Sequence, residues 1–193
     1  PHLVAALDDP VAQHALVQTA YVAALARTHD IPVLLSGDAA DELFLGYTHY
    51  PADQQLGRYL AVPRLLRHGL LDRVFAAQPW SDALQTLAYK SAHDEEAVRR
   101  YPQTPHFAER IAYTSLRRWV AEDSNMRVDK MTMLASVEAR APFQDPALID
   151  LAFSLPLDYK LRGGVRKQIL KDAVRGLVPD AVIERRKRVF APP

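Results

Sequence analysis

The chain has 193 residues, of which 49% are hydrophobic, enough for one compact core or two small ones. Its 24 Lys and Arg nearly balance its 23 Asp and Glu, so the overall charge gives no reason to expect nucleic-acid or membrane-surface binding. The absence of cysteine excludes a disulfide scaffold, thiolate metal ligands and a cysteine nucleophile within these residues. No apolar run approaches the roughly 20 residues of a membrane span, so a cytoplasmic location fits.

The first third of the chain predicts a helix, a strand and the start of a second helix. Apolar spacing predicts an amphipathic helix over residues 14–28. The residues that set this spacing are Val17, Tyr21, Ala24 and Leu25. Residues 32–36 form a short apolar run that is typical of a strand buried on both faces of a parallel sheet. Residues 41–46 then resemble the start of a helix, with Asp38 or Asp41 available to cap it.

The rest of the chain predicts helices. Residues 51–105 are punctuated by prolines, are typical of short helices and carry no motif. The pattern is helical over residues 107–120. A further helix carries Met131, Leu134 and Val137 and must stop before Pro142.

Two more helices follow Pro142. Asp145 is an N-cap candidate for a helix that has Pro146 at its first position and ends before Pro156. The last helix runs from about Val165 to Arg175, with Gly176 as its stop. A lone parallel strand leaves its backbone groups unsatisfied, so we expect neighbouring strands in a segment before Pro1. Because the chain opens on Pro1 without Met, we expect residues 1–193 to be one portion of a longer domain.

The most specific stretch is SGDAADELFLGY, which begins directly after the predicted strand. Ligands of open α/β sheets collect beyond the carboxyl ends of the strands. Ser36 and Gly37 can bring a hydroxyl and bare backbone close to a nucleotide, and Asp38, Asp41 and Glu42 add three carboxylates that suit Mg²⁺. The alternative is structural: both aspartates cap the helix and Glu42 favours its positive end.

The order of residues resembles a known family. SGDAADELFLGY is similar to the second nucleotide-site motif of the asparagine synthetase family, commonly SGDGADELFGGY. NMRVDKMTMLASVEARAPFQD looks like the family's stretch that ends in VEARVPFLD, and the segment from Leu161 to Arg188 looks like its stretch that ends in a basic RxK segment. Three blocks in the same order make the resemblance specific.

The resemblance implies an α/β fold of the adenine nucleotide alpha hydrolase-like, pyrophosphate-loop ATP pyrophosphatase type, of which this chain is a mostly helical part with one or few parallel strands. It implies a reaction in which ATP and Mg²⁺ convert a carboxylate to a carboxyl-adenylate, pyrophosphate leaves, and ammonia attacks the carbonyl. In asparagine synthetase the carboxylate is that of aspartate, and a separate glutaminase domain supplies the ammonia. A homo-oligomer is left open.

The family's residue roles transfer onto five positions. Ser36 and Gly37 would contact the AMP portion of ATP, and Asp38 would help to form or use the adenylate. Asp41 would hold Mg²⁺. Lys187 would lie against the carboxylate and the α-phosphate, where a compact cation stabilises developing charge. Without the resemblance, Lys187 is one member of a solvated basic run.

Other charged residues have structural interpretations. Arg140 is expected to be an ion-pair partner, Asp145 a helix cap, and Asp129 and Lys130 surface pairs.

The sequence departs from the family at several points. The pyrophosphate-binding SGGxDS loop is absent, as is the N-terminal cysteine of a glutaminase domain, so we expect this chain alone to be inactive. Ala39 and Leu45 stand where the family commonly has glycine, and Ala39 costs strain if its φ is positive. Gln144 replaces the usual Leu.

Three hypotheses follow from the sequence. The first is the C-terminal portion of a glutamine-dependent asparagine synthetase. The second is a relative that adenylates another acid, such as a β-lactam synthetase or a lasso-peptide cyclase; Asp38 favours the first, because β-lactam synthetases tend to carry an aromatic residue there. The third is a non-catalytic helical binding module.

Overall fold

The computed structural model describes residues 2–8, 13, 15–63 and 106–185. Contacts divide the chain into two compact units. The first unit comprises residues 1–40, 116–151 and 171–193, and the second comprises residues 41–115 and 152–170.

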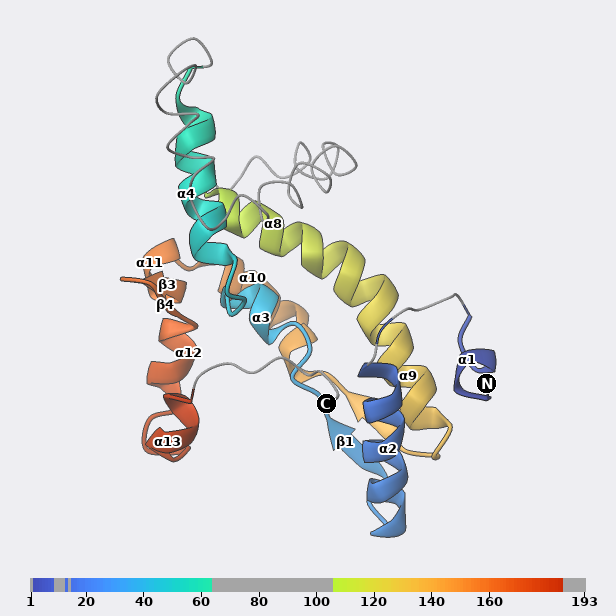
Figure 1. Cartoon of the computed structure of the whole chain (residues 1–193). Helices are drawn as coiled ribbons and strands as arrows, with labels where there is room; N and C mark the ends of the chain where they lie inside the picture. Colours follow the sequence, from blue (N-terminus) through green and yellow to red (C-terminus); the bar gives the residue numbers. More distant parts are fainter. Residues whose placement is uncertain (1, 9–12, 14, 64–105, 186–193) are drawn as a thin grey trace. The chain divides into compact units, whose positions relative to one another are not determined.

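Helices dominate the described residues (Figure 1). They are α1 (His2–Ala5), α2 (Ala15–Thr28), α3 (Ala40–Leu43), α4 (Tyr50–Ala61), α8 (Phe107–Ser115), the π-helix η1 (Leu116–Ser124), α9 (Asn125–Met133), the 3-10 helix η2 (Pro142–Gln144), α10 (Pro146–Ser154), α11 (Leu157–Lys160), α12 (Gln168–Ala173) and α13 (Asp180–Ile183). The strands are β1 (Val33–Leu35), β2 (Glu138–Arg140), β3 (Leu161–Arg162) and β4 (Val165–Arg166).

The first unit is built on a pair of parallel strands. β1 pairs with β2 in the register Val33–Glu138 to Leu35–Arg140, and the Ser36 N–H extends the ladder by donating to the Arg140 carbonyl at 2.7 Å. The predicted strand and its parallel direction are confirmed, but the partner found here, β2, lies within this chain and not in the segment before Pro1 where neighbouring strands were expected. The prediction that the strand is buried on both faces is wrong for the described residues, because Leu35 is 74% exposed.

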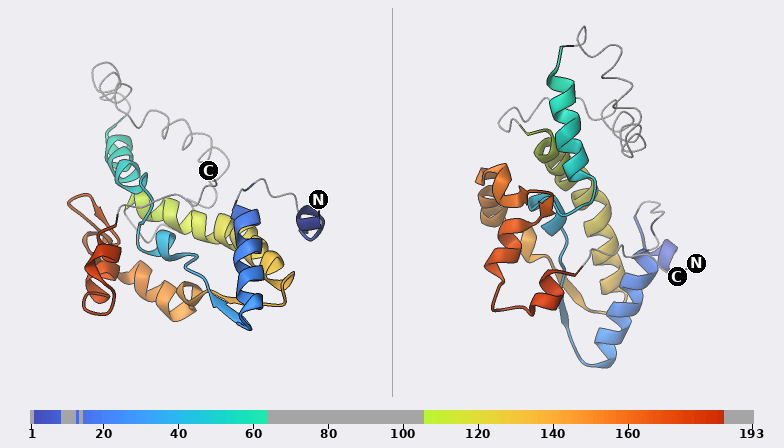
Figure 2. Two further views of the ribbon diagram at one scale, coloured as in Figure 1. Left: turned by 60° about the horizontal axis from the view of Figure 1, so that its bottom comes forward. Right: turned by 60° about the vertical axis from the view of Figure 1, so that its left-hand side comes forward.

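Helix α2 confirms the helix predicted over residues 14–28, and it packs against α9 (Figure 2). Its buried positions are Leu16, Ala23 and Ala26. The residues that set the predicted apolar spacing, Val17, Tyr21 and Leu25, are exposed instead. The buried face of α2 thus consists of one leucine and two alanines, while the larger side chains that set the predicted spacing face outward.

The helix predicted to carry Val137 ends earlier than expected. α9 stops at Met133, and Ser136 reverses the chain with a φ of +54°. The Val137 N–H donates back to the Thr132 carbonyl at 3.1 Å, and the chain then enters β2. The prediction of helix up to Pro142 is wrong because pairing with β1 places Glu138–Arg140 in a strand.

Local capping chemistry sets the start of α10. The Asp145 carboxylate accepts hydrogen bonds from the N–H groups of Ala147 at 2.9 Å and Leu148 at 3.2 Å. Pro146 occupies the first helical position, where its missing N–H costs no hydrogen bond. The predicted cap and helix are confirmed.

The second unit has its own apolar core, in which α4 packs against α8. The buried members of this core are Leu45, Tyr50, Ala108, Ile111, Ala112 and Leu157. A buried ion pair lies in the same unit: Lys160 Nζ is 2.6 Å from Glu109 Oε1, and Lys160 is 1% exposed.

Strands β3 and β4 form a two-residue hairpin in the second unit. Gly163 and Gly164 make its turn with φ of +56° and +83°. Two consecutive positive φ values match a turn of the type that twisted hairpins favour. The helix predicted from about Val165 therefore begins later, at Gln168. Gly176 follows that helix with a φ of +81°, as its predicted role as a stop requires.

In the part of the chain that the structure describes, no helix combines the length and apolarity needed to cross a membrane.

Candidate functional site

The turn after β1 contains the first three residues predicted for the site. The Ser36 hydroxyl donates to the Asp38 carboxylate, and the Asp38 N–H donates to Ser36 Oγ at 3.2 Å. Ala39 follows with a φ of +77°. Apart from Gly37 and its two chain neighbours, no atom of the described residues lies within 4 Å of the place that a Cβ on Gly37 would take. A ligand can therefore approach the backbone at Gly37.

A hydrogen-bonded chain in the first unit orients the Asp38 carboxylate. Ser124 Oγ donates to Asp38 Oδ1 at 2.9 Å, and Arg127 Nη2 donates to Ser124 Oγ at 2.9 Å. Arg127 is only 6% exposed, and its Nη1 also donates to Thr19 Oγ1 at 3.1 Å. The sequence analysis missed both Ser124 and Arg127. No periodicity or spacing marks them, although both lie beside or within the second family-like block.

Asp38 therefore receives two hydroxyl donors that hold its carboxylate in one orientation. The cationic Arg127 lies one hydroxyl further away and favours the same arrangement electrostatically. A carboxylate fixed in this way can accept a hydrogen bond from a ligand or orient a reacting group with little reorganisation.

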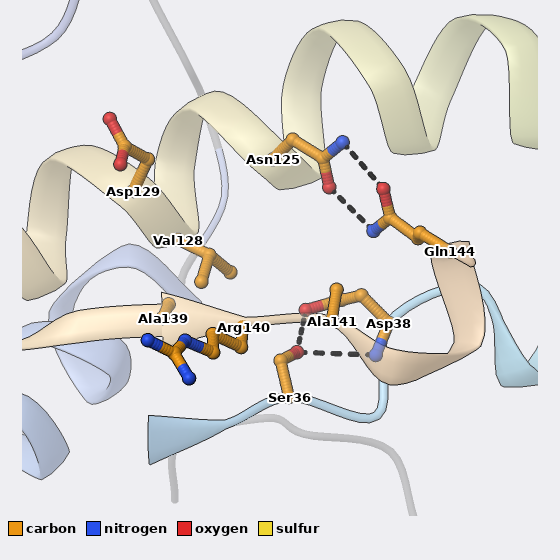
Figure 3. A pocket seen from close by; sticks show the side chains of 9 residues that line it. All are labelled: Ser36, Asp38, Asn125, Val128, Asp129, Ala139, Arg140, Ala141 and Gln144. Carbon is orange, nitrogen blue, oxygen red and sulfur yellow. Dashed lines mark hydrogen bonds between the residues drawn. The ribbon is translucent and has the colours of Figure 1, made fainter. Parts of the chain in front are cut away.

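A pocket of about 230 Å³ lies beside this turn (Figure 3). Asn125, Val128 and Asp129 share one face of α9, because their spacing of three and four residues returns the helix to the same side. The lining residues are Ser36, Asp38, Asn125, Val128, Asp129, Ala139, Arg140, Ala141 and Gln144. Most ligand pockets exceed about 300 Å³, so this one suits part of a ligand.

The charges around the pocket are unevenly compensated. Arg140 donates from Nε to Glu138 Oε1 at 2.9 Å and from Nη2 to Glu138 Oε2 at 3.2 Å. This hydrogen bond, together with the cationic charge of Arg140, lowers the pKa of Glu138. The expectation that Arg140 is an ion-pair partner is confirmed. Asp38 and Asp129 therefore set the sign of the charge in the pocket, which is negative.

Asp41, the predicted metal ligand, belongs to the second unit and lies in an ion pair. Its Oδ1 is 2.8 Å from Lys167 Nζ. Gly46 packs directly on this pair, since a Cβ at Gly46 would overlap both Asp41 Oδ1 and the Lys167 side chain. Among the described residues, no three His, Cys, Asp or Glu side chains converge as a metal site. The Mg²⁺ role of Asp41 stays a prediction.

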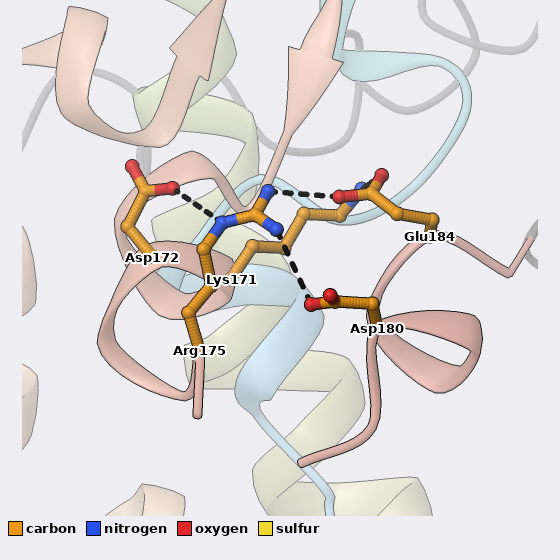
Figure 4. Close-up of polar contacts among 5 residues, drawn as sticks. All are labelled: Lys171, Asp172, Arg175, Asp180 and Glu184. Carbon is orange, nitrogen blue, oxygen red and sulfur yellow. Dashed lines mark hydrogen bonds and ion pairs between the residues drawn. The ribbon is translucent and has the colours of Figure 1, made fainter. Parts of the chain in front are cut away.

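Lys187 lies outside the described residues. The helix α13 is the last described helix before it. Glu184, the residue after α13, belongs to a network of ion pairs (Figure 4). Arg175 Nη2 is 2.8 Å from Glu184 Oε1, and the same guanidinium lies 3.6 Å from Asp180. Lys171 adds a contact of 3.6 Å to Glu184. These exposed pairs connect the end of α12 to α13.

Comparisons with known proteins agree with the resemblance seen in the sequence. A family model described as asparagine synthase matches residues 1–193. The chain is 29% identical over 226 residues to glutamine-hydrolysing asparagine synthetase 1 of Bacillus subtilis. This alignment covers 100% of this chain and 35% of that protein. It is 30% identical over 170 residues to glutamine-hydrolysing asparagine synthetase 3 of the same organism. That alignment covers 83% of this chain and 26% of that protein. The chain thus spans between about a quarter and about a third of the length of these relatives.

Proposed function

Because the chain belongs to the asparagine synthase family, we propose that it is the C-terminal portion of a synthetase domain that couples ATP to amide formation in a longer protein. The reaction would convert the side-chain carboxylate of aspartate to an adenylate and release pyrophosphate. Ammonia from a glutaminase domain would then attack the activated carbonyl to give asparagine. The domain would have the pyrophosphate-loop type of α/β fold and act in the cytoplasm.

The observation that carries this proposal is the turn from Ser36 to Asp38. It lies at the carboxyl end of a parallel strand, where α/β sheets bind their ligands, and it borders a pocket. The open space at Gly37 and the fixed carboxylate of Asp38 meet the demands of a nucleotide site that must also control a reacting carboxyl group.

The parts of the reaction are assigned to five residues. Ser36 and Gly37 would bind the AMP portion of ATP through a hydroxyl and exposed backbone. Asp38 would act on the adenylate, and Lys187 would stabilise the charge that builds on the α-phosphate and the carboxylate. Asp41 would supply one carboxylate to Mg²⁺, with the phosphates and water as the remaining ligands.

The residues present are compatible with ATP and Mg²⁺. Mg²⁺ in nucleotide sites is often held by one or two carboxylates together with phosphate oxygens, so one acid at Asp41 is sufficient on the protein side. The Mg²⁺ would neutralise phosphate charge. Lys167 Nζ lies 2.8 Å from Asp41 Oδ1, and this ion pair keeps the carboxylate oriented.

The proposal is tested in the longer protein by following aspartate-dependent release of pyrophosphate from ATP and Mg²⁺. We expect Lys187→Ala and Asp41→Asn each to abolish release, because the first would remove the cation assigned to the α-phosphate and the second the carboxylate assigned to Mg²⁺. Arg188→Ala is the matched control for the basic run and should retain release. Residues 1–193 alone should release none.

Near-normal release from both Lys187→Ala and Asp41→Asn would overturn the assigned roles. Absence of release from the wild-type longer protein, with every candidate acid, would overturn the amide-forming function and favour a non-catalytic binding module. Release with another carboxylate but not with aspartate would overturn asparagine synthesis and favour a related adenylating synthetase.

A further inference from the structure

Two amide side chains face each other at one end of the pocket (Figure 3). Asn125 begins α9, and Gln144 ends η2. Asn125 Nδ2 donates to Gln144 Oε1 at 2.8 Å, and Gln144 Nε2 donates to Asn125 Oδ1 at 2.7 Å. Gln144 is also the residue at which this sequence departs from the leucine that is usual in the family. The departure thus adds a polar group to the pocket wall.

The reciprocal pairing leaves hydrogen-bonding capacity unused. Each amide has two N–H donors and an oxygen with two lone pairs. The pair consumes one donor and one lone pair of Asn125 and the same of Gln144. One N–H and one lone pair therefore remain on each side chain, and both side chains line the pocket. A leucine at residue 144 would offer a ligand none of these.

The charge of the pocket restricts what can meet this edge. Asp38 and Asp129 contribute carboxylates, and the guanidinium of Arg140 is engaged by Glu138. Of the described lining residues, Arg140 alone carries a permanent positive charge. A phosphate or carboxylate placed here would meet two carboxylates, and the lining cation, Arg140, already pairs with Glu138. An anion is therefore disfavoured, and the uncharged amides of Asn125 and Gln144 offer their remaining hydrogen bonds to a neutral group.

The apolar lining restricts its shape. Val128, Ala139 and Ala141 supply apolar wall between the polar groups, and the pocket holds about 230 Å³. Apolar surface suits the faces of a planar group, while the amides suit its hydrogen-bonding edge.

We propose that Asn125 and Gln144 select a neutral, planar ligand group that carries a hydrogen-bond donor and an acceptor side by side, as an amide does. This inference rests on the proposed function, because that function places a nucleotide and an amino acid at the turn beside the pocket. Two sources offer this chemistry: the amino-pyrimidine edge of adenine and the carboxamide of asparagine. Asn125 and Gln144 would determine specificity, and neither would take part in the chemical reaction.

The test measures binding to the longer protein by calorimetry with two matched pairs of probes. Adenosine is compared with purine riboside, which lacks the 6-amino group, and asparagine is compared with 2-aminobutyrate, which lacks the carboxamide. Wild-type protein should prefer the amide-like member of one pair by about tenfold, the effect of one or two hydrogen bonds in a partly buried site. The pair that shows the preference identifies the source.

Gln144→Leu should abolish this preference and change the affinity for the other member less than threefold. Gln18→Leu is the matched control, because Gln18 lies on α2 and does not line the pocket. Gln144→Glu serves as a second variant should the leucine disturb folding: it keeps an acceptor for Asn125, loses the donor and adds a third carboxylate, and it too should lose the preference.

A preference that survives both Gln144 variants would overturn the inference and leave the pair as a link between α9 and η2 only. Equal binding within both probe pairs by the wild-type protein would overturn it as well. Pyrophosphate release separates this outcome from failure of the proposed function: a protein that releases pyrophosphate without either preference refutes the amide edge alone, whereas a preference without release refutes the reaction alone.

Discussion

Replacing Ala39 with glycine should be far less damaging than the same replacement at Ala40. Ala39 has a φ of +77°, a left-handed conformation that costs a non-glycine residue about 1–2 kcal/mol. Ala40 is the next residue, is similarly buried and does not have a positive φ. The two substitutions remove the same methyl group from adjacent positions, so their difference isolates the backbone conformation.

The magnitudes follow from burial. Ala39 is 2% exposed and Ala40 is 6% exposed, so each change loses about 0.8 kcal/mol of apolar burial. Each also adds about 0.5–1 kcal/mol of backbone entropy to the unfolded chain. Ala40→Gly should therefore lower the free energy of unfolding by about 1.3–1.8 kcal/mol. Ala39→Gly also relieves the strain of the positive φ, which offsets these losses. It should therefore change the free energy of unfolding by less than about 1 kcal/mol in either direction.

Urea unfolding, followed by circular dichroism, compares both variants with the unsubstituted chain at one pH and temperature. The midpoints should differ between the variants while the slopes agree. Equal losses of stability for Ala39→Gly and Ala40→Gly would refute the reasoning, because they would mean that the left-handed conformation stores no strain.

Two further predictions concern buried polar groups of the second unit. Lys160→Met should lower the free energy of unfolding by about 3–5 kcal/mol, because it leaves the 3% exposed Glu109 without the cation at 2.6 Å. Combining it with Glu109→Leu should recover most of that loss in urea unfolding; a double variant no more stable than the single one would contradict this. Burial, followed by the charge of Glu42, raises the pKa of Tyr50, so the folded state keeps the phenol proton and stability should be lost as the pH rises past the unfolded value of about 10. Tyr50→Phe should remove that alkaline loss in urea titrations between pH 8 and 11, and an unchanged pH dependence would count against it.

The features best predicted from the sequence are those that depend on nearby residues. The Asp145 cap was predictable because a short carboxylate, a proline at the first position and an apolar face all lie within one helix. The strand β1 was predictable because its apolar run is bounded by Pro32 and Ser36. The hairpin turn could have been predicted as well, because Gly163 and Gly164 are adjacent glycines of the kind that favour a two-residue turn. Residues 163 and 164 were not assigned to a turn from the sequence.

Features that depend on distant pairing were not predictable in this way. Glu138–Ala139–Arg140 alternates polar and apolar residues, but three residues are too few to predict a strand, and the triplet becomes β2 because β1 pairs with it. Ser124 and Arg127 reach Asp38 only once α9 is packed beside the strands. The hydrogen bonds that orient the Asp38 carboxylate could therefore not be predicted from the sequence. The family resemblance identified the acidic turn, but it could not show which side chains support it.

The two glycines that this turn shares with the family have different physical explanations. At Gly46 a Cβ would overlap the side chains of Asp41 and Lys167, so any other residue there would displace their ion pair. Gly37 has no such constraint within the described structure: its φ is not positive, and the space beside it is open. At Ala39 and at a further family glycine position, Leu45, the chain keeps the positive φ and accepts the strain of a side chain. A glycine that neither packing nor conformation demands leaves its backbone open to a ligand, which is what the proposed contact between Gly37 and the nucleotide requires.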